Sequence, residues 1–276
     1  MGIFQIVKVI HLLVLYSEIN NSEIVQFFKR HIYFGYNENF IFFFKQKMMS
    51  SINFDGNLLF GSKEQLAISP FGNGCWFESL YESEYYSSIV NSDIEWFNVF
   101  AVDNVLQKIA DPVFIGATLA SKAACGAKVV SKANALEKVG VLCSVDSKPA
   151  IVEYYEMTDE MINLKDKNGE LEYRYGVILN YLFRKDKLVN IINQRLPIHI
   201  AKKIIPFLNE HDEYITPSEP NGYKFETLVI DMVHMMEDCL PYEVKRNKEF
   251  APIKNMTGVD SLESARKLLL ENEIDI

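Results

Sequence analysis

Short apolar runs alternate with helically spaced apolar residues along most of this chain. The runs predict strands at residues 12–15, 40–44, 58–60, 96–102, 139–145 and 151–155. Apolar spacing of three and four residues predicts helices at residues 21–31, 113–126, 182–196 and 225–239, one that starts near Trp76, and a last one at residues 260–271. Because strands and helices alternate, we expect an α/β sheet layered by helices.

Turn and cap signals separate these elements. Asn21 or Ser22 is expected to cap the first helix, and Asp260 with Glu263 the last one. Residues 54–57 and 146–149 have the composition of tight turns. The sequence contains no internal repeat and no low-complexity linker, so one domain with a short C-terminal appendage is the simplest division.

The N-terminal residues 4–16 are mostly apolar and could be mistaken for a secretion signal. They lack a basic leading region and a small-residue cleavage site, and Lys8 and His11 interrupt them. They are also too short to span a bilayer. A buried strand is the better interpretation, and no other segment suggests a membrane partner.

Composition narrows the function. About half of the residues (49%) are hydrophobic and 24% are charged, which is typical of a globular protein with a core. The net charge of −9 disfavours general nucleic-acid binding, because an acidic surface repels a phosphate backbone. A small phosphorylated ligand held by a few lysines remains compatible with this charge.

Cysteine and histidine spacing disfavours metal and redox chemistry. None of the four cysteines forms a C-x-x-C pair, so reduced thiols in a cytoplasmic protein are the favoured interpretation. The five histidines are scattered and form no H-E-x-x-H, so a histidine-based metal site is not expected.

Three groups follow predicted strands or lie within them, where α/β sheets bind ligands. Asp103 directly follows the strand predicted at residues 96–102, and it could hold Mg²⁺ or merely cap the next turn. Gly72-Asn73-Gly74 would let a ligand approach the backbone, although such a segment is usually only a turn. Glu153 lies in a predicted strand, where its side chain is about equally expected to face a ligand or solvent.

Two lysines have suggestive positions. Lys224 is expected to open a helix after Pro220-Asn221-Gly222, and Lys254 follows Phe250-Ala251-Pro252-Ile253. Lysine is a good point-charge partner for phosphate, but a surface lysine is the default alternative for each.

Several segments occur in the same order as in one enzyme family. The segments are FNVFAVDN (97–104), ADPVFIG (110–116), CGAKVV (125–130), VGV (139–141), VEY (152–154), KI (203–204), PNGYK (220–224) and FAPIKN (250–255). Together they resemble the eukaryotic UDP-N-acetylglucosamine pyrophosphorylases from about residue 10 to 270. The resemblance implies a three-layer α/β/α fold with a mixed sheet, the Rossmann-like core of nucleotide-diphospho-sugar transferases.

The resemblance also implies a reaction. Such an enzyme is a uridylyltransferase that forms UDP-N-acetylglucosamine and pyrophosphate from UTP and N-acetylglucosamine 1-phosphate, with Mg²⁺, in the cytoplasm. The sugar phosphate attacks the α-phosphorus in line, and catalysis is mostly positioning and charge neutralisation.

Site residues are implied position by position. Those implied for the nucleotide are Gln46 and Gly72 at the uracil base, Asp103 at the nucleotide and Mg²⁺, and Lys224 at the UTP phosphates. Those implied for the sugar are Asn73, Gly140, Glu153 and Tyr154, with Lys254 at the sugar phosphate. Lys224 and Lys254 are the implied catalytic residues.

The sequence also departs from the family pattern. The family core opens with a glycine-rich phosphate loop, L-x-G-G-x-G-T-R-L-G, and nothing before Tyr16 resembles it. A sugar-pocket asparagine is Val177 here, two pocket phenylalanines are Leu228 and Ile230, and a glycine is Cys75. The resemblance therefore implies a core at residues 1–255 that is incomplete at both ends, with a remnant C-terminal helix at 256–276.

These departures leave three interpretations open. The chain could be an enzyme whose phosphate loop comes from an upstream exon, a misplaced start codon or a partner chain. It could be a non-catalytic UDP-sugar-binding or regulatory protein derived from such an enzyme. It could also be a decaying gene product without a stable fold. Val177 in place of asparagine predicts weaker discrimination for the N-acetyl group.

Overall fold

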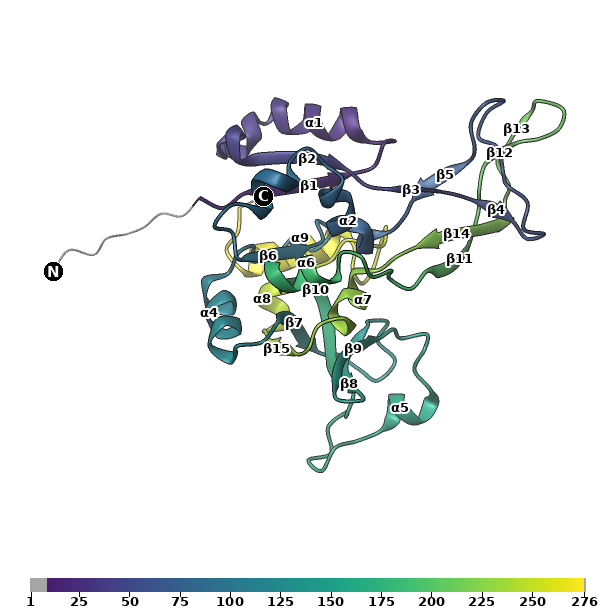
Figure 1. Ribbon diagram of the computed structural model, residues 1–276. Coiled ribbons are helices and arrows are strands. Elements are labelled where there is room, and N and C mark those ends of the chain that lie inside the picture. Colours follow the sequence, from purple (N-terminus) through teal and green to yellow (C-terminus); the bar gives the residue numbers. More distant parts are fainter. Residues whose placement is uncertain (1–8, 276) are drawn as a thin grey trace. The chain divides into compact units, whose positions relative to one another are not determined.

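The computed structural model describes residues 9–275, which form two compact units (Figure 1). Unit 1 contains the residues up to Ser92 together with Gln194–Val229, and unit 2 contains Asp93–Asn193 together with the residues from Ile230 onward. The chain therefore passes from one unit to the other three times. Helices and strands of both orientations are present, so the predicted mixed α/β class is confirmed.

Unit 1 begins with a parallel pair of strands. β1 (Leu12–Tyr16) pairs with β2 (Ile41–Lys45), and α1 (Asn21–Arg30) connects them. Both strands agree with the sequence within a residue, but β1 is mostly half-buried rather than buried. Within residues 9–275, β2 pairs with β1 alone, so it lies at an edge. Residues 4–8 of the predicted N-terminal strand lie outside the described residues.

The first helix is capped differently from the prediction. Its N-cap residue is Asn20, not Asn21 or Ser22, and the Asn20 side chain accepts hydrogen bonds from the Ser17 amide and hydroxyl at 2.9 Å. The amide oxygen thus stabilises the preceding turn rather than the helix.

The rest of unit 1 is built from short strands and helices. Antiparallel pairing joins β3 to β5, β12 to β13, and β11, β14 and β4 in that order. The bounds are β3 (Met48–Ser50), β4 (Ile52–Asn53), β5 (Ile68–Pro70), β11 (His199–Lys203), β12 (Phe207–Leu208), β13 (Tyr214–Ile215), β14 (Gly222–Glu226), α2 (Trp76–Tyr81) and α3 (Tyr86–Val90), with 3-10 turns η1 (Ile32–Gly35), η2 (Glu38–Phe40) and η3 (Asn73–Cys75).

The turn predicted at residues 54–57 is present, but the strand expected after it is not. Asn53 Oδ1 accepts from the amides of Asp55 and Asn57, which closes the turn. Leu58 and Phe60 make only isolated bridges, so residues 58–60 form no strand.

Unit 2 is organised around a six-stranded mixed sheet. Its strand order is β15-β7-β10-β8-β9, and β6 also pairs with β10. The β15–β7 pair is parallel and the other pairs are antiparallel. The strands are β6 (Trp96–Phe100), β7 (Cys125–Ser131), β8 (Val141–Val145), β9 (Lys148–Val152), β10 (Tyr175–Arg184) and β15 (Cys239–Glu243). The helices are α4 (Pro112–Ser121), α5 (Asp159–Asn163), α6 (Lys185–Ile191), α8 (Arg246–Glu249), α9 (Leu262–Glu271) and α7 (Val229–His234), which begins at the last residue of unit 1.

Three predicted helices were too long. The helix expected at residues 113–126 ends at Ser121, because Lys122 takes a left-handed conformation (φ 61°) and β7 begins at Cys125. The helix expected at 182–196 starts only at Lys185, since residues 182–183 finish β10 inside the sheet. The helix expected at 225–239 divides into the end of β14, α7 and the start of β15.

The last helix packs into unit 2. Ala265 of α9 is buried against Leu106 and Ala251. Its N-cap is Ser261 in a capping box with Ser264, not the predicted pair of Asp260 and Glu263, because Asp260 is in a left-handed conformation one residue earlier. The division predicted at residue 255 stays a prediction.

A fully buried lysine lies in the sheet of unit 2. Lys128 of β7 is 0% exposed, and its ammonium contacts Asp111 Oδ2 at 2.8 Å and Glu249 Oε2 at 2.5 Å. Asp111 caps α4 and Glu249 ends α8, so one buried charge joins the consecutive elements α4 and β7 to α8, which is distant in sequence. Burial alone would raise the pKa of Asp111, but the hydrogen bond and charge of Lys128 outweigh it and lower that pKa below its usual value.

The substitution Lys128→Met should destabilise the protein by about 3–5 kcal/mol, because it leaves two carboxylates buried without their cation. Urea denaturation followed by circular dichroism measures this difference. Lys267→Met is the matched control, since the Lys267–Glu271 pair is exposed and should contribute no more than about 0.5 kcal/mol. Equal losses from both variants would contradict the stabilising role of the cluster.

Acid should weaken the same cluster. Because the folded-state pKa of Asp111 is lowered, its contribution to stability is complete above the unfolded value of about 3.9 and is lost as pH falls through the folded value. Wild type should therefore lose more stability than Asp111→Asn as pH falls from about 4 toward the lowered folded-state pKa of Asp111. Parallel stability–pH curves for the two proteins would show that the pair carries no such linkage.

Candidate functional site

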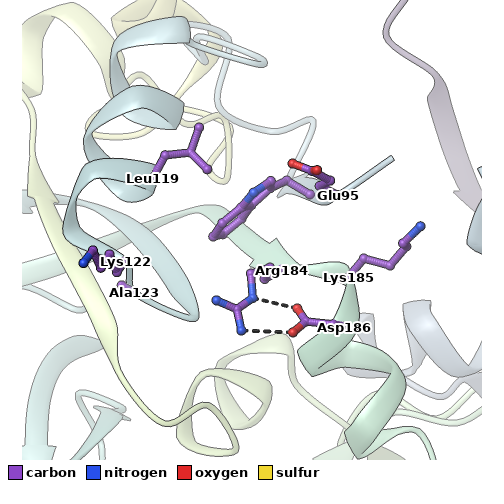
Figure 2. Close-up of a pocket in the computed structure, with 8 residues that line it drawn as sticks. Glu95, Leu119, Lys122, Ala123, Arg184, Lys185 and Asp186 are labelled. Carbon is purple, nitrogen blue, oxygen red and sulfur yellow. Dashed lines mark hydrogen bonds and ion pairs between the residues drawn. The ribbon is translucent and has the colours of Figure 1, made fainter. Parts of the chain in front are cut away.

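A cavity of about 450 Å³ opens on unit 2, away from the predicted site residues. The side chains that line it include Glu95, Leu119, Lys122, Arg184, Lys185 and Asp186 (Figure 2). Arg184 and Asp186 form a bidentate ion pair, with nitrogen–oxygen distances of 2.6 and 2.9 Å. These two charges satisfy one another, and none of the residues predicted at the site lines the cavity.

In unit 1 the two residues predicted at the uracil base are neighbours. Gln46 directly follows β2, and its Nε2 donates to the Gly72 carbonyl at 2.5 Å. The Cys75 thiol donates to the same carbonyl at 3.1 Å. Burial raises the pKa of this thiol above its usual value, so it remains a neutral donor at pH 7.

Gly72-Asn73-Gly74 was predicted to let a ligand approach the backbone, but the groups that approach it in the structure belong to the protein itself. Gly72 has φ 89°, and a Cβ there would lie 2.8 Å from Thr227 N. The Gly74 amide donates to the Thr227 carbonyl at 2.9 Å, and Asn73 Oδ1 accepts from the Val229 amide at 2.9 Å. The glycines therefore let residues 72–74 pack on residues 227–229, and the Asn73 amide oxygen is already used.

Lys224 lies in β14, not at the start of a helix as predicted. Its backbone is opposite Ala201 of β11, and its side chain is half-buried. The turn before it is fixed by Asn221, whose side chain exchanges two hydrogen bonds with the Ile205 backbone, at 2.7 and 3.0 Å. A strand holds the direction of this lysine more firmly than a helix end that frays.

In unit 2 the structure brings Asp103 and Lys254 together. Asp103 Oδ2 lies 3.8 Å from Lys254 Nζ, and the two side chains are 37% and 61% exposed. Asp103 does not follow the strand at once, because β6 ends at Phe100 and Asp103 lies in the next loop. Both groups are partly exposed, so a phosphate could reach the ammonium of Lys254 and a metal ion the carboxylate of Asp103.

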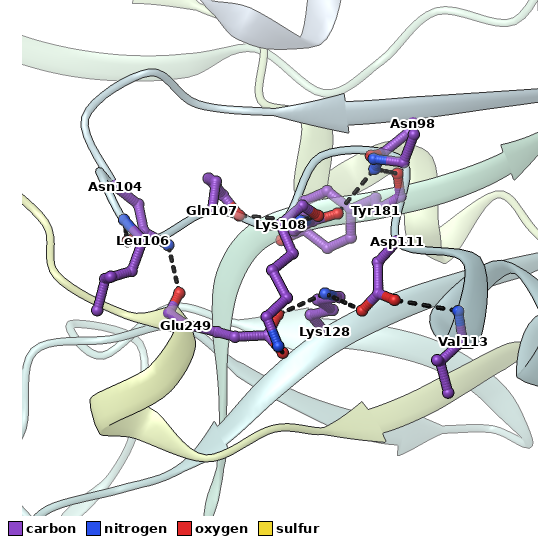
Figure 3. Close-up of polar contacts among 12 residues, drawn as sticks. Asn98, Asn104, Leu106, Gln107, Lys108, Asp111, Val113, Lys128, Tyr181 and Glu249 are labelled. Atoms are coloured by element: carbon purple, nitrogen blue, oxygen red, sulfur yellow. Dashed lines mark hydrogen bonds and ion pairs between the residues drawn. The ribbon is translucent and has the colours of Figure 1, made fainter. Parts of the chain in front are cut away.

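Side-chain amides hold the loop that carries Asp103, residues 101–111. Asn98 Oδ1 accepts from the Ala110 amide at 2.8 Å, and the buried Asn180 donates through Nδ2 to Gln107 Oε1 at 2.9 Å. Figure 3 labels Asn98 and Gln107. Asn98 and Asn180 also bond to each other at 2.7 Å. Asn180 follows Leu179, whose φ of 50° marks the irregularity in the β10–β7 register.

Two of the residues predicted at the sugar are also neighbours in unit 2. A Cβ on Gly140 would touch Glu153 Oε1 at 3.4 Å and would crowd Ile151 Cγ2 at 3.1 Å, so Gly140 lies directly beside this carboxylate. Glu153 was expected inside a strand, but β9 ends at Val152 and Glu153 opens a turn closed by the Glu156 amide. Tyr154 is 40% exposed and contacts Tyr155 edge to face.

The residues that depart from the family pattern are distributed over both units. Val177, in β10, donates its amide to the Gly140 carbonyl at 2.9 Å and so lies beside the glycine–glutamate pair. Leu228 is packed against Gly74, whose Cβ would collide with the Leu228 backbone. Ile230 is the first residue of unit 2 after this segment and is half-buried.

The predicted residues are thus divided between the two units, with three neighbouring pairs among them: Gln46–Gly72, Asp103–Lys254 and Gly140–Glu153. Unit 1 carries Gln46, Gly72, Asn73 and Lys224, and unit 2 carries Asp103, Gly140, Glu153, Tyr154 and Lys254. The sequence interpretation missed the residues that support Asp103, above all Asn98, Asn180 and Lys128. Lys128 had a detectable signal, because it is the single charge in the apolar run from Cys125 to Val130.

No three histidine, cysteine or acidic side chains within residues 9–275 come together as a metal cluster would require. Within the same residues, every helix is too short or too polar to cross a bilayer.

Known proteins resemble this chain over nearly its whole length. The human UDP-N-acetylhexosamine pyrophosphorylase-like protein 1 is 35% identical over 262 residues, covering 93% of this chain and 52% of the relative. The Saccharomyces cerevisiae UDP-N-acetylglucosamine pyrophosphorylase is 36% identical over 256 residues, covering 89% and 53%. This chain therefore spans about half the length of the curated relatives it matches.

Solved structures agree with the sequence relatives. A UDP-N-acetylglucosamine pyrophosphorylase structure from Entamoeba histolytica superposes with a TM-score of 0.87 at 32% identity, covering 95% of this chain and 66% of that one. The Trypanosoma brucei enzyme of the same name, in complex with an inhibitor, gives 0.83 at 25% identity, covering 95% and 53%. The profile of one family, described as UTP–glucose-1-phosphate uridylyltransferase, matches residues 9–273. The chain belongs to this uridylyltransferase family.

Proposed function

We propose that this chain acts in uridylyl transfer, forming UDP-N-acetylglucosamine and pyrophosphate from UTP and N-acetylglucosamine 1-phosphate. The observation that carries the proposal is the Asp103–Lys254 pair, 3.8 Å apart on two neighbouring loops of a chain from a uridylyltransferase family. The names of the relatives support N-acetylglucosamine as the sugar.

The exposure of this pair suits a binding role. An ion pair between two partly exposed groups contributes only about 0–1 kcal/mol, so a ligand can open it at little cost. A phosphate would compete for the ammonium of Lys254 while a cation competes for the carboxylate of Asp103. By contrast, the charges of Lys128 and its partners are buried and closed to a ligand.

Asp103 fits a magnesium ion shared with a nucleotide. Mg²⁺ is usually held by one or two carboxylates plus substrate phosphates and water, rather than by a cage of protein ligands. A single, 37% exposed carboxylate matches that pattern. When bound, the ion would neutralise phosphate charge and fix the orientation of the phosphates.

The sugar would lie at the glycine–glutamate pair. A carboxylate such as Glu153 accepts hydrogen bonds from sugar hydroxyl groups. Gly140 lies next to this carboxylate and has no side chain. The exposed Tyr154 ring offers an apolar surface beside it. Val177 lies beside Gly140 and has no side-chain amide there. This supports the expectation of weaker discrimination for the N-acetyl group.

In the proposed reaction, an oxygen of the sugar phosphate bonds to the α-phosphorus of UTP. The bond from that phosphorus to the bridging oxygen breaks, and pyrophosphate leaves. Lys254 would hold the attacking sugar phosphate and Lys224 the UTP phosphates, so the protein would contribute positioning and positive charge. No covalent protein intermediate is required.

The substitution Lys254→Ala should lower the rate of pyrophosphate release on the order of a hundredfold, because it removes a charge that offsets the developing negative charge. The assay contains the chain, UTP, N-acetylglucosamine 1-phosphate and Mg²⁺. Lys267→Ala, on the exposed face of α9, is the control and should react at the wild-type rate.

Two outcomes would change this interpretation. Equal rates for Lys254→Ala and wild type would remove Lys254 from the proposed site. A wild-type chain that binds UDP-N-acetylglucosamine in a calorimeter but releases no pyrophosphate would support the non-catalytic, UDP-sugar-binding alternative.

The substitution Asp103→Asn should abolish most of the gain in UTP affinity that Mg²⁺ provides. Loss of a direct carboxylate ligand should cost at least about tenfold in affinity, since even supporting residues of metal sites cost that much. Calorimetric titration of UTP with and without MgCl₂ measures the gain. Asp212→Asn, an exposed aspartate in unit 1, is the control, and a Mg²⁺ effect that survives Asp103→Asn would exclude Asp103 as a ligand.

A further inference from the structure

We propose that Asn104 is the positioning residue of the candidate site and fixes the spacing between Asp103 and Lys254. The inference rests on the proposed function for its catalytic consequence, but the clamp itself is a property of the fold. Asn104 is adjacent to Asp103 in sequence, yet its side chain is directed away from solvent and is only 4% exposed.

The Asn104 amide joins the two loops that carry the site. Its Nδ2 donates to the Glu249 carbonyl at 2.8 Å, and its Oδ1 accepts from the Ala251 amide at 2.8 Å. Figure 3 shows this side chain reaching toward Glu249. One end of the amide donates and the other accepts, so neither aspartate nor leucine can replace both bonds.

Backbone hydrogen bonds continue the connection up to the charged pair. The Val105 amide donates to the Ala251 carbonyl at 3.3 Å, and the Ile253 amide donates to the Asp103 carbonyl at 2.9 Å. Asn104 and Pro252 form an antiparallel bridge between these bonds. Asp103 and Lys254 therefore lie at one end of a short two-stranded ladder, and the Asn104 side chain joins the two strands of this ladder near its other end.

Glu249 is held at two places, at its backbone carbonyl by Asn104 and at its carboxylate by two lysines. The Glu249 carboxylate is held by Lys128 at 2.5 Å and by Lys108 at 3.3 Å, and Lys108 belongs to the Asp103 loop. The ionic contacts hold the base of both loops in the fold, whereas the amide of Asn104 acts next to the charged pair. Loss of the amide should therefore affect site geometry more than the sheet.

The expected effect falls on turnover rather than on binding. Asp103 and Lys254 remain present in an Asn104 variant, so each can still bind its own ligand. Their mutual spacing matters when two phosphates must meet, and a misplacement of about 1 Å can cost on the order of a hundredfold in rate. For Asn104→Leu we expect kcat to fall about tenfold to a hundredfold, with KM within about threefold of wild type.

The experiment compares Asn104→Leu, Asn104→Asp and the control Asn272→Leu in two measurements. Asn272 also donates from its amide to two backbone carbonyls in unit 2, at 2.8 and 2.7 Å, but it belongs to neither loop. Hydrogen exchange should speed up at the Val105, Ala251 and Ile253 amides in Asn104→Leu while β7 and β10 stay protected. Asn104→Asp, which keeps the acceptor, should give smaller changes in exchange and in kcat.

The outcomes separate this inference from the proposed function. Unchanged exchange at residues 105, 251 and 253 would overturn the clamp. Faster exchange with an unchanged kcat, or an equal loss of kcat in Asn272→Leu, would overturn the positioning role. A wild-type chain without turnover would refute the catalytic function, and the exchange data alone would then decide the clamp.

Discussion

The buried ammonium of Lys128 is the constraint around which unit 2 is arranged. A charge in the middle of a sheet is tolerated only when it is paired and hydrogen-bonded, so Asp111 and Glu249 cannot leave their positions independently. Asp111 ends the loop that carries Asp103, and Glu249 directly precedes the loop that carries Lys254. The same contact that satisfies one buried charge thus sets where both loops begin or end.

Much of the local structure could be predicted, because it depends on neighbouring residues. The strands at residues 12–16 and 41–45 follow from their apolar runs, and the turn at residues 54–57 from Asp-Gly chemistry. The predictions were wrong where an apolar segment fits both the helical and the strand periodicity. Leu182 and Phe183 fit a helical face, but pairing with β6 and β7 keeps them in the sheet, and that pairing comes from distant residues. Local patterns carry no information about such partners.

The candidate site could likewise be predicted only in part. Asp103, Glu153 and Lys254 were found by residue type, position and family resemblance, and the structure places Asp103 beside Lys254 and Glu153 beside Gly140. Their surroundings were not predictable. The Gly72-Asn73-Gly74 segment suggested the approach of a ligand, whereas the structure packs residues 227–229 against it. Asn98, Asn104 and Asn180 were missed because a buried amide is recognised only once its partners are known.

The split of unit 1 into two sequence segments has a consequence for synthesis of the chain. β4 pairs with β14 through Ile52 and Tyr223, about 170 residues apart, and the whole first segment of unit 2 lies between them. At about 5–20 residues per second, β4 leaves the ribosome roughly ten to thirty seconds before its partner exists. During that time the sheet edge of β4 is exposed, while the residues that follow can already begin to fold. The order of emergence, and not only the final contacts, therefore determines how long the edge of β4 stays unpaired.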